Sequence, residues 1–308
     1  MAFDKKTLVL PDGTTFEEHN IVTSGDVILG NHVKCGFGIK TDGRVFGGQG
    51  IEVQGDIDCG GDLRLDQSCH VVGDIRSGAN AYLGERVYVK GDLALEGDLN
   101  VGDDVRIGGQ LKAKGWVNKR SPVPLLIYIF IYLLELLRMG QSDEVERILK
   151  ELEEAESEEI AVGDVFLFIP DGSEIGVQAS TVKGALETGA GCRVLGNLTV
   201  KGDVRLGEGT RIHGALRCEG DVIMEPDAEV EGDLDATGKV VVGEGCQVLG
   251  DLTAKSVDMF TSATVDGKIV ALDGVKFRTE EQERRRKTAE GKKEEFEGKA
   301  SDLVDLLG

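Results

Sequence analysis

An apolar residue stands at every sixth position from Ile21 to Val117, and this period limits the possible folds more than any other feature of the chain. The series runs Ile21, Val27, Val33, Ile39, Val45, Ile51, Ile57, Leu63, Cys69, Ile75, Ala81, Val87, Leu93, Leu99, Val105, Leu111, Val117. Only 40% of the 308 residues are apolar, so chance would rarely give seventeen in an unbroken series. Helices cannot sustain a period of six, because an α-helix has 3.6 residues per turn.

A second apolar position follows two residues after the first in many of these hexads, for example at Leu65, Val89 and Leu95. Residues i and i+2 of a strand face the same side, so each hexad predicts a very short strand with two inward side chains. Glycine recurs two residues before the ladder position, as at Gly73 and Gly91, and we expect its backbone freedom to permit a corner.

Three hexads make one coil of 18 residues with three faces, and successive coils stack about one strand spacing apart, roughly 4.8 Å. The sequence therefore predicts an all-β fold, a parallel β-helix. One face should carry a ladder of Ile39, Ile57, Ile75, Leu93 and Leu111.

The second half of the chain repeats the first at an offset of 159 residues. Pro11-Asp12-Gly13 matches Pro170-Asp171-Gly172, and Gly91-Asp92-Leu93 matches Gly250-Asp251-Leu252. The second ladder runs Leu186, Cys192, Leu198, Val204, Thr210, Leu216, Val222, Ala228, Leu234, Val240, Cys246, Leu252 and then decays at Asp258 and Thr264. We expect two tandem β-helices made by duplication, a first lobe over residues 1–118 with an N-terminal cap and a second over 161–277.

Residues 119–160 break the hexad pattern and predict a helical linker that contains one apolar segment. That segment is Leu125, Leu126, Ile127, Tyr128, Ile129, Phe130, Ile131, Tyr132, Leu133, Leu134. With its extension to Leu137 it has about 13 residues, fewer than the roughly 20 that span a bilayer. Three interpretations stay open: a helix buried against the lobes or a sister subunit, a segment at 125–137 that enters one membrane leaflet, or a strand. Residues 278–308 predict a charged helical or disordered tail.

Composition limits the possible partners and compartments. The formal net charge of −21 opposes binding to nucleic acid phosphates, so we expect no nucleic acid partner. The first six residues lack the apolar core of a signal peptide, which predicts a cytoplasmic protein, with membrane association through 125–137 as an open alternative.

The residues that usually carry chemistry do not form a recognisable site in the sequence. The four histidines and six cysteines show no metal-ligand spacing, so we expect no catalytic residue, metal or cofactor. All six cysteines fall in ladder registers, where they should face inward as small apolar fillers. The recurring Gly-Asp pairs do not have the spacing of the nonapeptide calcium motif, and we interpret Asp there as a side chain that bonds the turning backbone.

The segment Val89-Lys90-Gly91-Asp92-Leu93-Ala94-Leu95-Glu96-Gly97-Asp98-Leu99 resembles the bactofilins, the polymer-forming cytoskeletal proteins, and so does the segment 248–255. The resemblance implies a right-handed β-helix that polymerises end to end, without catalytic activity, and membrane association as a further expectation. Bactofilins usually have one such domain with short tails, so two lobes and a linker depart from their pattern. Two alternatives are a hexapeptide-repeat acyltransferase-like enzyme, whose repeat places Gly after the ladder residue, and a small-ligand or carbohydrate-binding module.

A β-helix leaves unpaired backbone groups on its first and last coils, which can pair with another chain. The candidate assembly ends are Leu8 and Leu10 near the start, and Ile269, Val270 and Leu272 near the end. The expected partner is therefore a second copy of the chain. The related segments 7–13 and 166–172 should each lie across the end of a lobe as a partial cap.

Overall fold

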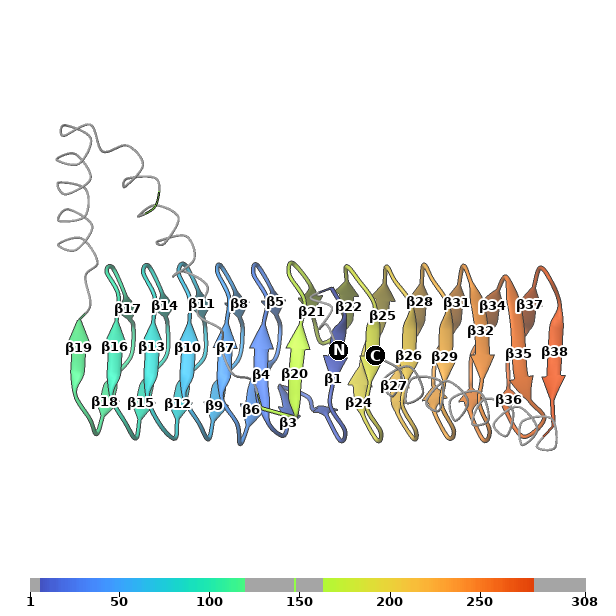
Figure 1. Cartoon of the computed structure of the whole chain (residues 1–308), viewed down its shortest axis with the longest axis horizontal. Coiled ribbons are helices and arrows are strands. Elements are labelled where there is room, and N and C mark those ends of the chain that lie inside the picture. The colour runs from blue at the N-terminus through green and yellow to red at the C-terminus, as the bar shows by residue number, and fades with distance from the viewer. Residues whose placement is uncertain (1–5, 120–146, 148–162, 280–308) are drawn as a thin grey trace, which may run out of the picture. The chain divides into compact units, whose positions relative to one another are not determined.

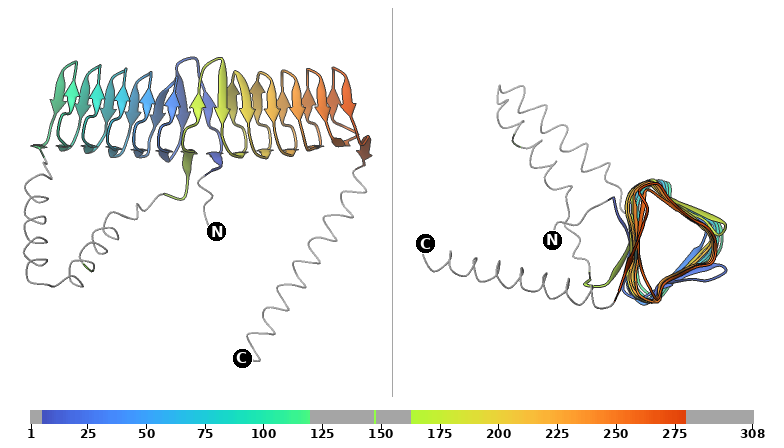
Figure 2. Two further views of the ribbon diagram at one scale, coloured as in Figure 1. Left: turned by 90° about the horizontal axis from the view of Figure 1, so that it is seen from above. Right: turned by 90° about the vertical axis from the view of Figure 1, so that its right-hand side faces the viewer.

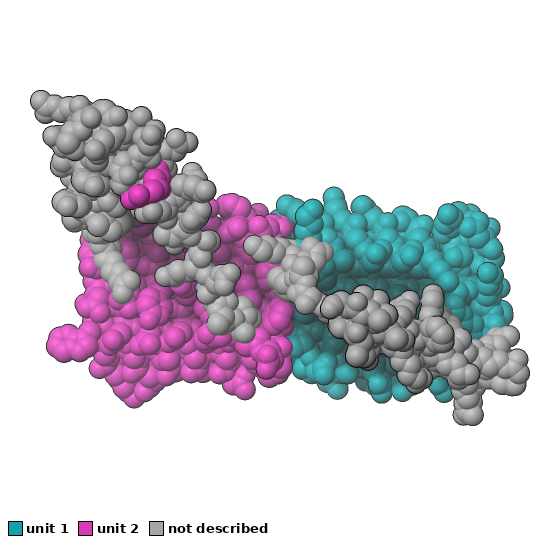
Figure 3. Space-filling model, in the orientation of Figure 1, with its two compact units in different colours: residues 1–18, 173–308 teal, residues 19–172 magenta. Residues whose placement is uncertain are grey.

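The computed structural model describes residues 6–119, 147 and 163–279, and it confirms an all-β parallel solenoid. The strands β1 to β38 fall into two compact units (Figure 3). Unit 1 comprises residues 1–18 and 173–308, and unit 2 comprises residues 19–172. The expected helical linker with its apolar segment 125–134, and the tail beyond residue 279, lie outside the described residues.

Unit 2 consists of three parallel sheets, to which the successive coils contribute their strands in turn (Figure 1). The first sheet contains β20 (Phe166–Ile169), β4 (Asp26–Leu29), β7 (Val45–Gly47), β10 (Leu63–Leu65), β13 (Ala81–Leu83), β16 (Leu99–Val101) and β19 (Val117–Lys119). The second contains β3 (Asn20–Thr23), β6 (Gly38–Thr41), β9 (Ile57–Cys59), β12 (Ile75–Ser77), β15 (Leu93–Leu95) and β18 (Leu111–Ala113). The third contains β5 (Lys34–Cys35), β8 (Glu52–Val53), β11 (His70–Val71), β14 (Tyr88–Val89) and β17 (Arg106–Ile107).

Unit 1 has the same three-sheet construction. Its first sheet contains β1 (Leu8–Leu10), β23 (Leu186–Thr188), β26 (Val204–Leu206), β29 (Val222–Met224), β32 (Lys239–Val242), β35 (Ser256–Phe260) and β38 (Val275–Arg278). Its second contains β2 (Thr15–Phe16), β24 (Arg193–Leu195), β27 (Arg211–His213), β30 (Glu229–Val230), β33 (Gln247–Val248) and β36 (Thr264–Val265). Its third contains β21 (Glu174–Ile175), β22 (Ala179–Val182), β25 (Asn197–Val200), β28 (Leu216–Cys218), β31 (Leu234–Ala236), β34 (Leu252–Ala254) and β37 (Ile269–Ala271), with β21 antiparallel to β22.

The predicted ladders form the core of each unit. Ile39 pairs with Ile57, Ile57 with Ile75, and Ile75 with Leu93, each 18 residues further on. Seen along the coils, the strands outline a triangle (Figure 2), and these ladder side chains are buried. All six cysteines are buried, as their register predicted. The period of six therefore specifies both the strands and the face that each side chain occupies.

The predicted decay of the second ladder at Asp258 has a simple structural cause. One coil of unit 1 has 17 residues, because Val240 pairs with Val257 rather than with Asp258. Asp258 therefore points outward, where its carboxylate forms ion pairs with Lys239 Nζ (2.5 Å) and Arg278. The shortened corner shifts the register by one residue and keeps an apolar side chain in the core.

The two units do not follow the order of the chain. Strand β1 pairs with β23, so the N-terminal segment belongs to the unit built mainly from the second repeat. Strand β20, the equivalent segment of the second repeat, pairs with β4 in unit 2 (Figure 1). Each repeat therefore completes its first coil with the segment that precedes the other repeat. The lobe boundaries 1–118 and 161–277 stay predictions from the sequence.

The carboxylates of the Gly-Asp pairs accept hydrogen bonds from the backbone at a corner, as expected, and this corner belongs to the next coil. The carboxylate of Asp74 accepts a hydrogen bond from the backbone N–H of Asp92 in the next coil (2.9 Å), and Asp56 does the same for Asp74 (2.8 Å). Gly91 does not have a positive φ, so left-handed backbone does not explain this glycine. A Cβ at Gly91 would instead lie 2.5 Å from Asp74 Oδ1. Glycine is needed there because the carboxylate of the previous coil occupies the space of its side chain.

Candidate assembly ends

The last coil of unit 2 exposes side chains that are buried in every coil before it. Strands β17, β18 and β19 are each the edge strand at one end of their sheet. The ladder partner Leu93 is buried, but Leu111 in β18 is 42% exposed. Leu99 is likewise buried, and Val117 in β19 is 54% exposed. This end combines open strand edges with an uncovered apolar core.

The last coil of unit 1 has the same character. Strands β36, β37 and β38 end their sheets, and the ladder that passes through buried Met259 finishes at Phe277, which is 62% exposed. Ile269 is half-buried on the inward side and pairs with Leu252, whereas Val270 lies outward. Leu272 is 84% exposed at the following corner. Three of the expected assembly residues therefore lie on an exposed terminal coil.

The other two expected assembly residues lie in a different environment. Leu8 and Leu10 are buried in β1, against β23 of unit 1. Their role in assembly stays a prediction, whereas Leu111, Val117 and Phe277 are exposed ladder residues that our sequence analysis did not select. The sequence does indicate two of them as residues of a last coil, because Leu111 and Val117 are the final two members of the first hexad series.

Ion pairs neutralise much of the charge around the unit 2 end. Lys119 Nζ lies 3.3 Å from Asp103 Oδ1, and Arg106 Nη2 lies 3.0 Å from Asp104 Oδ1. Next to them the Trp116 side chain is 80% exposed, and its backbone N–H donates to the Asp98 carboxylate of the preceding coil (2.7 Å). Such an end suits the addition of strands from another solenoid, because backbone hydrogen bonds and apolar contacts form together.

The described residues offer no comparable arrangement for chemistry. No group of three or more His, Cys, Asp or Glu side chains within them could hold a metal ion. Burial raises the pKa of Cys35, Cys59, Cys69 and Cys246 to about 11, so these thiols are poor nucleophiles at neutral pH. The terminal coils are therefore the strongest candidate for a functional surface.

Comparison with known proteins points in the same direction. The family model for bactofilins, described as polymer-forming cytoskeletal, matches residues 179–280, about a third of the chain. The matched region begins at β22 and includes the exposed last coil of unit 1. No curated protein and no solved structure matches the chain. In the parts of the chain that the structure describes, no helix has the length and apolar character to cross a bilayer.

Proposed function

We propose that this chain is a polymer-forming cytoskeletal or scaffold protein whose copies associate through their terminal coils, because the bactofilin family model matches residues 179–280. The observation that carries the proposal is the exposed ladder at β17–β19 and β36–β38. We extend the proposal to the first repeat because the same motifs recur at the 159-residue offset and form the same 18-residue coils. The self-partner is thus a second copy that presents the same kind of end.

The energetics of such a contact are favourable at unit 2. Complete burial of a Val or Leu side chain contributes about 1.5–3 kcal/mol, and Leu111 and Val117 each retain roughly half of that gain for a partner. A partner strand would also satisfy the backbone groups on the outer edges of β18 and β19. The chain offers both contributions at one place, as self-assembly requires.

A lysine pair on the unit 2 end tests this proposal. We expect Leu111→Lys with Val117→Lys to reduce the sedimenting fraction strongly, because charges replace the apolar contact, while the circular dichroism spectrum keeps its β-structure. The matched control is Gln110→Lys with Asn118→Lys, which adds the same charge to exposed positions of the same coil outside the ladder.

The control variant should sediment like the parent. If the Leu111/Val117 variant and a variant of the unit 1 end, Val270→Pro with Leu272→Lys, both assemble like the parent, the terminal coils are not the assembly surface. A parent that stays monomeric at high concentration would refute the polymer function itself.

The proposal includes a cytoplasmic location and a contact of residues 125–137 with a membrane surface. The membrane contact is supported by the unbroken apolar run 125–134 and its basic flanks at Lys119, Arg120 and Arg138. Flotation with anionic vesicles should carry the parent upward and leave an Ile127→Asp, Ile131→Asp variant at the bottom. Equal flotation of both proteins would exclude this segment as the membrane contact and favour its contact with a sister subunit.

A further inference from the structure

Two related segments of the chain make the same contacts on two different coils. In unit 1, the backbone N–H of Gly189 donates to the carbonyl of Leu10 (2.7 Å), and Asp12 Oδ1 accepts the N–H of Ala190 (2.8 Å). The N–H of Gly13 in turn donates to the Ala190 carbonyl (2.8 Å). The segment 7–13 is here called docking strand A. It is fixed by the pairing of β1 with β23 and also by its Pro-Asp-Gly end.

In unit 2, the segment 166–172, here called docking strand B, repeats this pattern. The N–H of Gly30 donates to the carbonyl of Ile169 (2.7 Å), and Asp171 Oδ1 accepts the N–H of Asn31 (2.8 Å). The N–H of Gly172 donates to the Asn31 carbonyl (2.8 Å). Every one of the three bonds has a counterpart in unit 1 with the same atoms and the same length.

The coil that receives each docking strand has a glycine that leaves room for the aspartate, as Gly91 does for Asp74. A Cβ at Gly189 would lie 2.2 Å from Asp12 Oδ1, and a Cβ at Gly30 would lie 2.4 Å from Asp171 Oδ1. The receiving site therefore recognises a backbone edge and a carboxylate, and both docking strands supply these. Nothing in these contacts selects one docking strand over the other.

Each docking strand lies on the repeat that it does not precede. Leu10 pairs with Thr188, and Ile169 pairs with Leu29, whereas the 159-residue offset makes Leu29 the equivalent of Thr188. The two repeats are thus completed by an exchange of equivalent segments. Docking strand A requires a second repeat to bind, and docking strand B requires a first repeat. The contacts do not require the two repeats to belong to one chain.

The length of chain between the repeats allows partners from different copies. The 43 residues from 120 to 162 connect β19 to the start of the segment that leads into docking strand B, and they can span at most about 150 Å. A connection inside one chain raises the effective concentration of its own partner, so the exchange within one chain dominates in dilute solution. At the high local concentration of an assembly, a second copy competes for the same sites.

We propose that docking strands A and B also bind the receiving coils of a second copy of this chain, so that copies become linked by exchanged strands. The occupant is the same Pro-Asp-Gly strand in every case, recognised by the glycine-lined backbone edge. This link does not depend on the terminal coils, and it can hold whether or not the chain polymerises through its ends.

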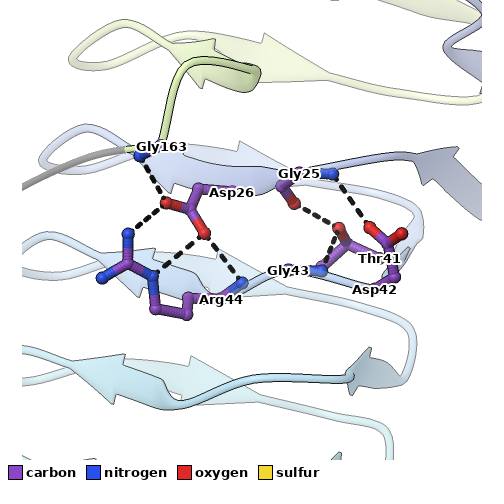
Figure 4. A network of polar contacts seen from close by, with 7 residues as sticks. All are labelled: Gly25, Asp26, Thr41, Asp42, Gly43, Arg44 and Gly163. Carbon is purple, nitrogen blue, oxygen red and sulfur yellow. Dashed lines mark hydrogen bonds and ion pairs between the residues drawn. The ribbon is translucent and has the colours of Figure 1, made fainter.

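One receiving coil holds its docking strand with an additional anchor. In unit 2, Asp26 Oδ2 accepts the N–H of Gly163 (2.9 Å), just before docking strand B, while Arg44 Nη2 lies 2.5 Å from the same oxygen (Figure 4). The equivalent position in unit 1 is Ala185, which has no carboxylate. The matched change Asp26→Ala therefore removes the anchor and should favour exchange.

Single-cysteine copies of the full chain provide the test. Val9 and Glu187 are paired outward positions of β1 and β23, so cysteines there lie within disulfide range. Val9→Cys and Glu187→Cys copies with different tags are mixed in denaturant, refolded together at high concentration and oxidised. The six native cysteines are buried, which keeps the background low. We expect a disulfide-linked heterodimer, and more of it when both copies carry Asp26→Ala.

Two controls keep the result interpretable. The double variant Val9→Cys, Glu187→Cys should form its disulfide within one chain, which verifies the register. Replacing Glu187→Cys by Thr253→Cys, an outward position on another sheet, should abolish the heterodimer. If the mixed copies give no more heterodimer than this control, exchange between copies is refuted. Repeating the mixture in the Leu111→Lys, Val117→Lys background separates this outcome from a failure of end-to-end assembly, because strand exchange should persist there.

Discussion

In the row of corners that contains Asp56, Asp74 and Asp92, residues from consecutive coils fit each other as a pair. Asp74 occupies the space where Gly91 would have a side chain, and its carboxylate accepts the N–H of Asp92. A carboxylate that accepts a backbone N–H at each step stabilises the corner more than a neutral acceptor would. The aspartate and the glycine 17 residues later therefore match each other, although they lie in different hexads.

Substitution of Gly91 tests this fit. In Gly91→Ala, the new Cβ would lie 2.5 Å from both Asp74 Oδ1 and the Gly73 carbonyl oxygen, so the coils must separate locally. We expect a loss of about 1–3 kcal/mol in the free energy of unfolding, measured by urea denaturation. Gly163→Ala is the control, because its Cβ would meet its nearest neighbour, Asp26 Oδ2, at 3.4 Å. Equal midpoints for the two variants would contradict the explanation.

At the scale of the strand, the sequence predicts the ladders well because two independent periods agree. The alternation i, i+2 specifies which side chains face inward, and the period of six specifies where each corner falls, so Ile57, Ile75 and Leu93 stack as expected. The exchange of β1 and β20 could not be predicted. Leu29 in β4 and Thr188 in β23 occupy equivalent positions in the two repeats. The sequence pattern therefore does not indicate which of these two strands pairs with Leu10.

The exposed ends illustrate a second limit. A hexad predicts an inward side chain but not whether another coil covers it, so Leu93 and Leu111 look alike in the sequence although only Leu111 is exposed. The 17-residue coil could not be predicted either, because the hexad count assumes that every corner has the same length. A corner shortened by one residue moves Val257 into the ladder, and a strict count of six places Asp258 there instead.

Strand β38 is held to its unit by a titratable contact. Burial raises the pKa of Asp258, but hydrogen bonds and charge from Lys239 and Arg278 outweigh it and hold the pKa below its ordinary value of 3.8. The contact therefore stabilises the last coil fully above about pH 4 and is lost as the pH falls through the lowered pKa. We expect Asp258→Asn to unfold at a lower temperature than the parent at pH 7, with the difference shrinking below pH 4. A difference that is the same at pH 7 and pH 3 would exclude this origin.

At the scale of the whole molecule, the net charge of −21 opposes the association of copies. The proposed contact surfaces are apolar, so salt should weaken the repulsion without weakening the contact. We expect the assembled fraction, measured by sedimentation, to rise as ionic strength increases from about 10 mM to 150 mM, where the Debye length falls from roughly 30 to 8 Å. Dissociation over this range would instead indicate that ion pairs hold the copies together.

The Gly-Asp pairing also governs how long such a unit can be. Removal of residues 74–91 would join Gly73 to Asp92, and Asp56 would then accept the N–H of Asp92 as it now accepts that of Asp74. In this row of corners, Gly73-Asp74 and Gly91-Asp92 each supply one glycine for the coil before and one aspartate for the coil after. A cassette of 18 residues can thus be lost or gained with its neighbours still matched, and the length of the unit changes in increments of about 4.8 Å while its cross-section stays the same.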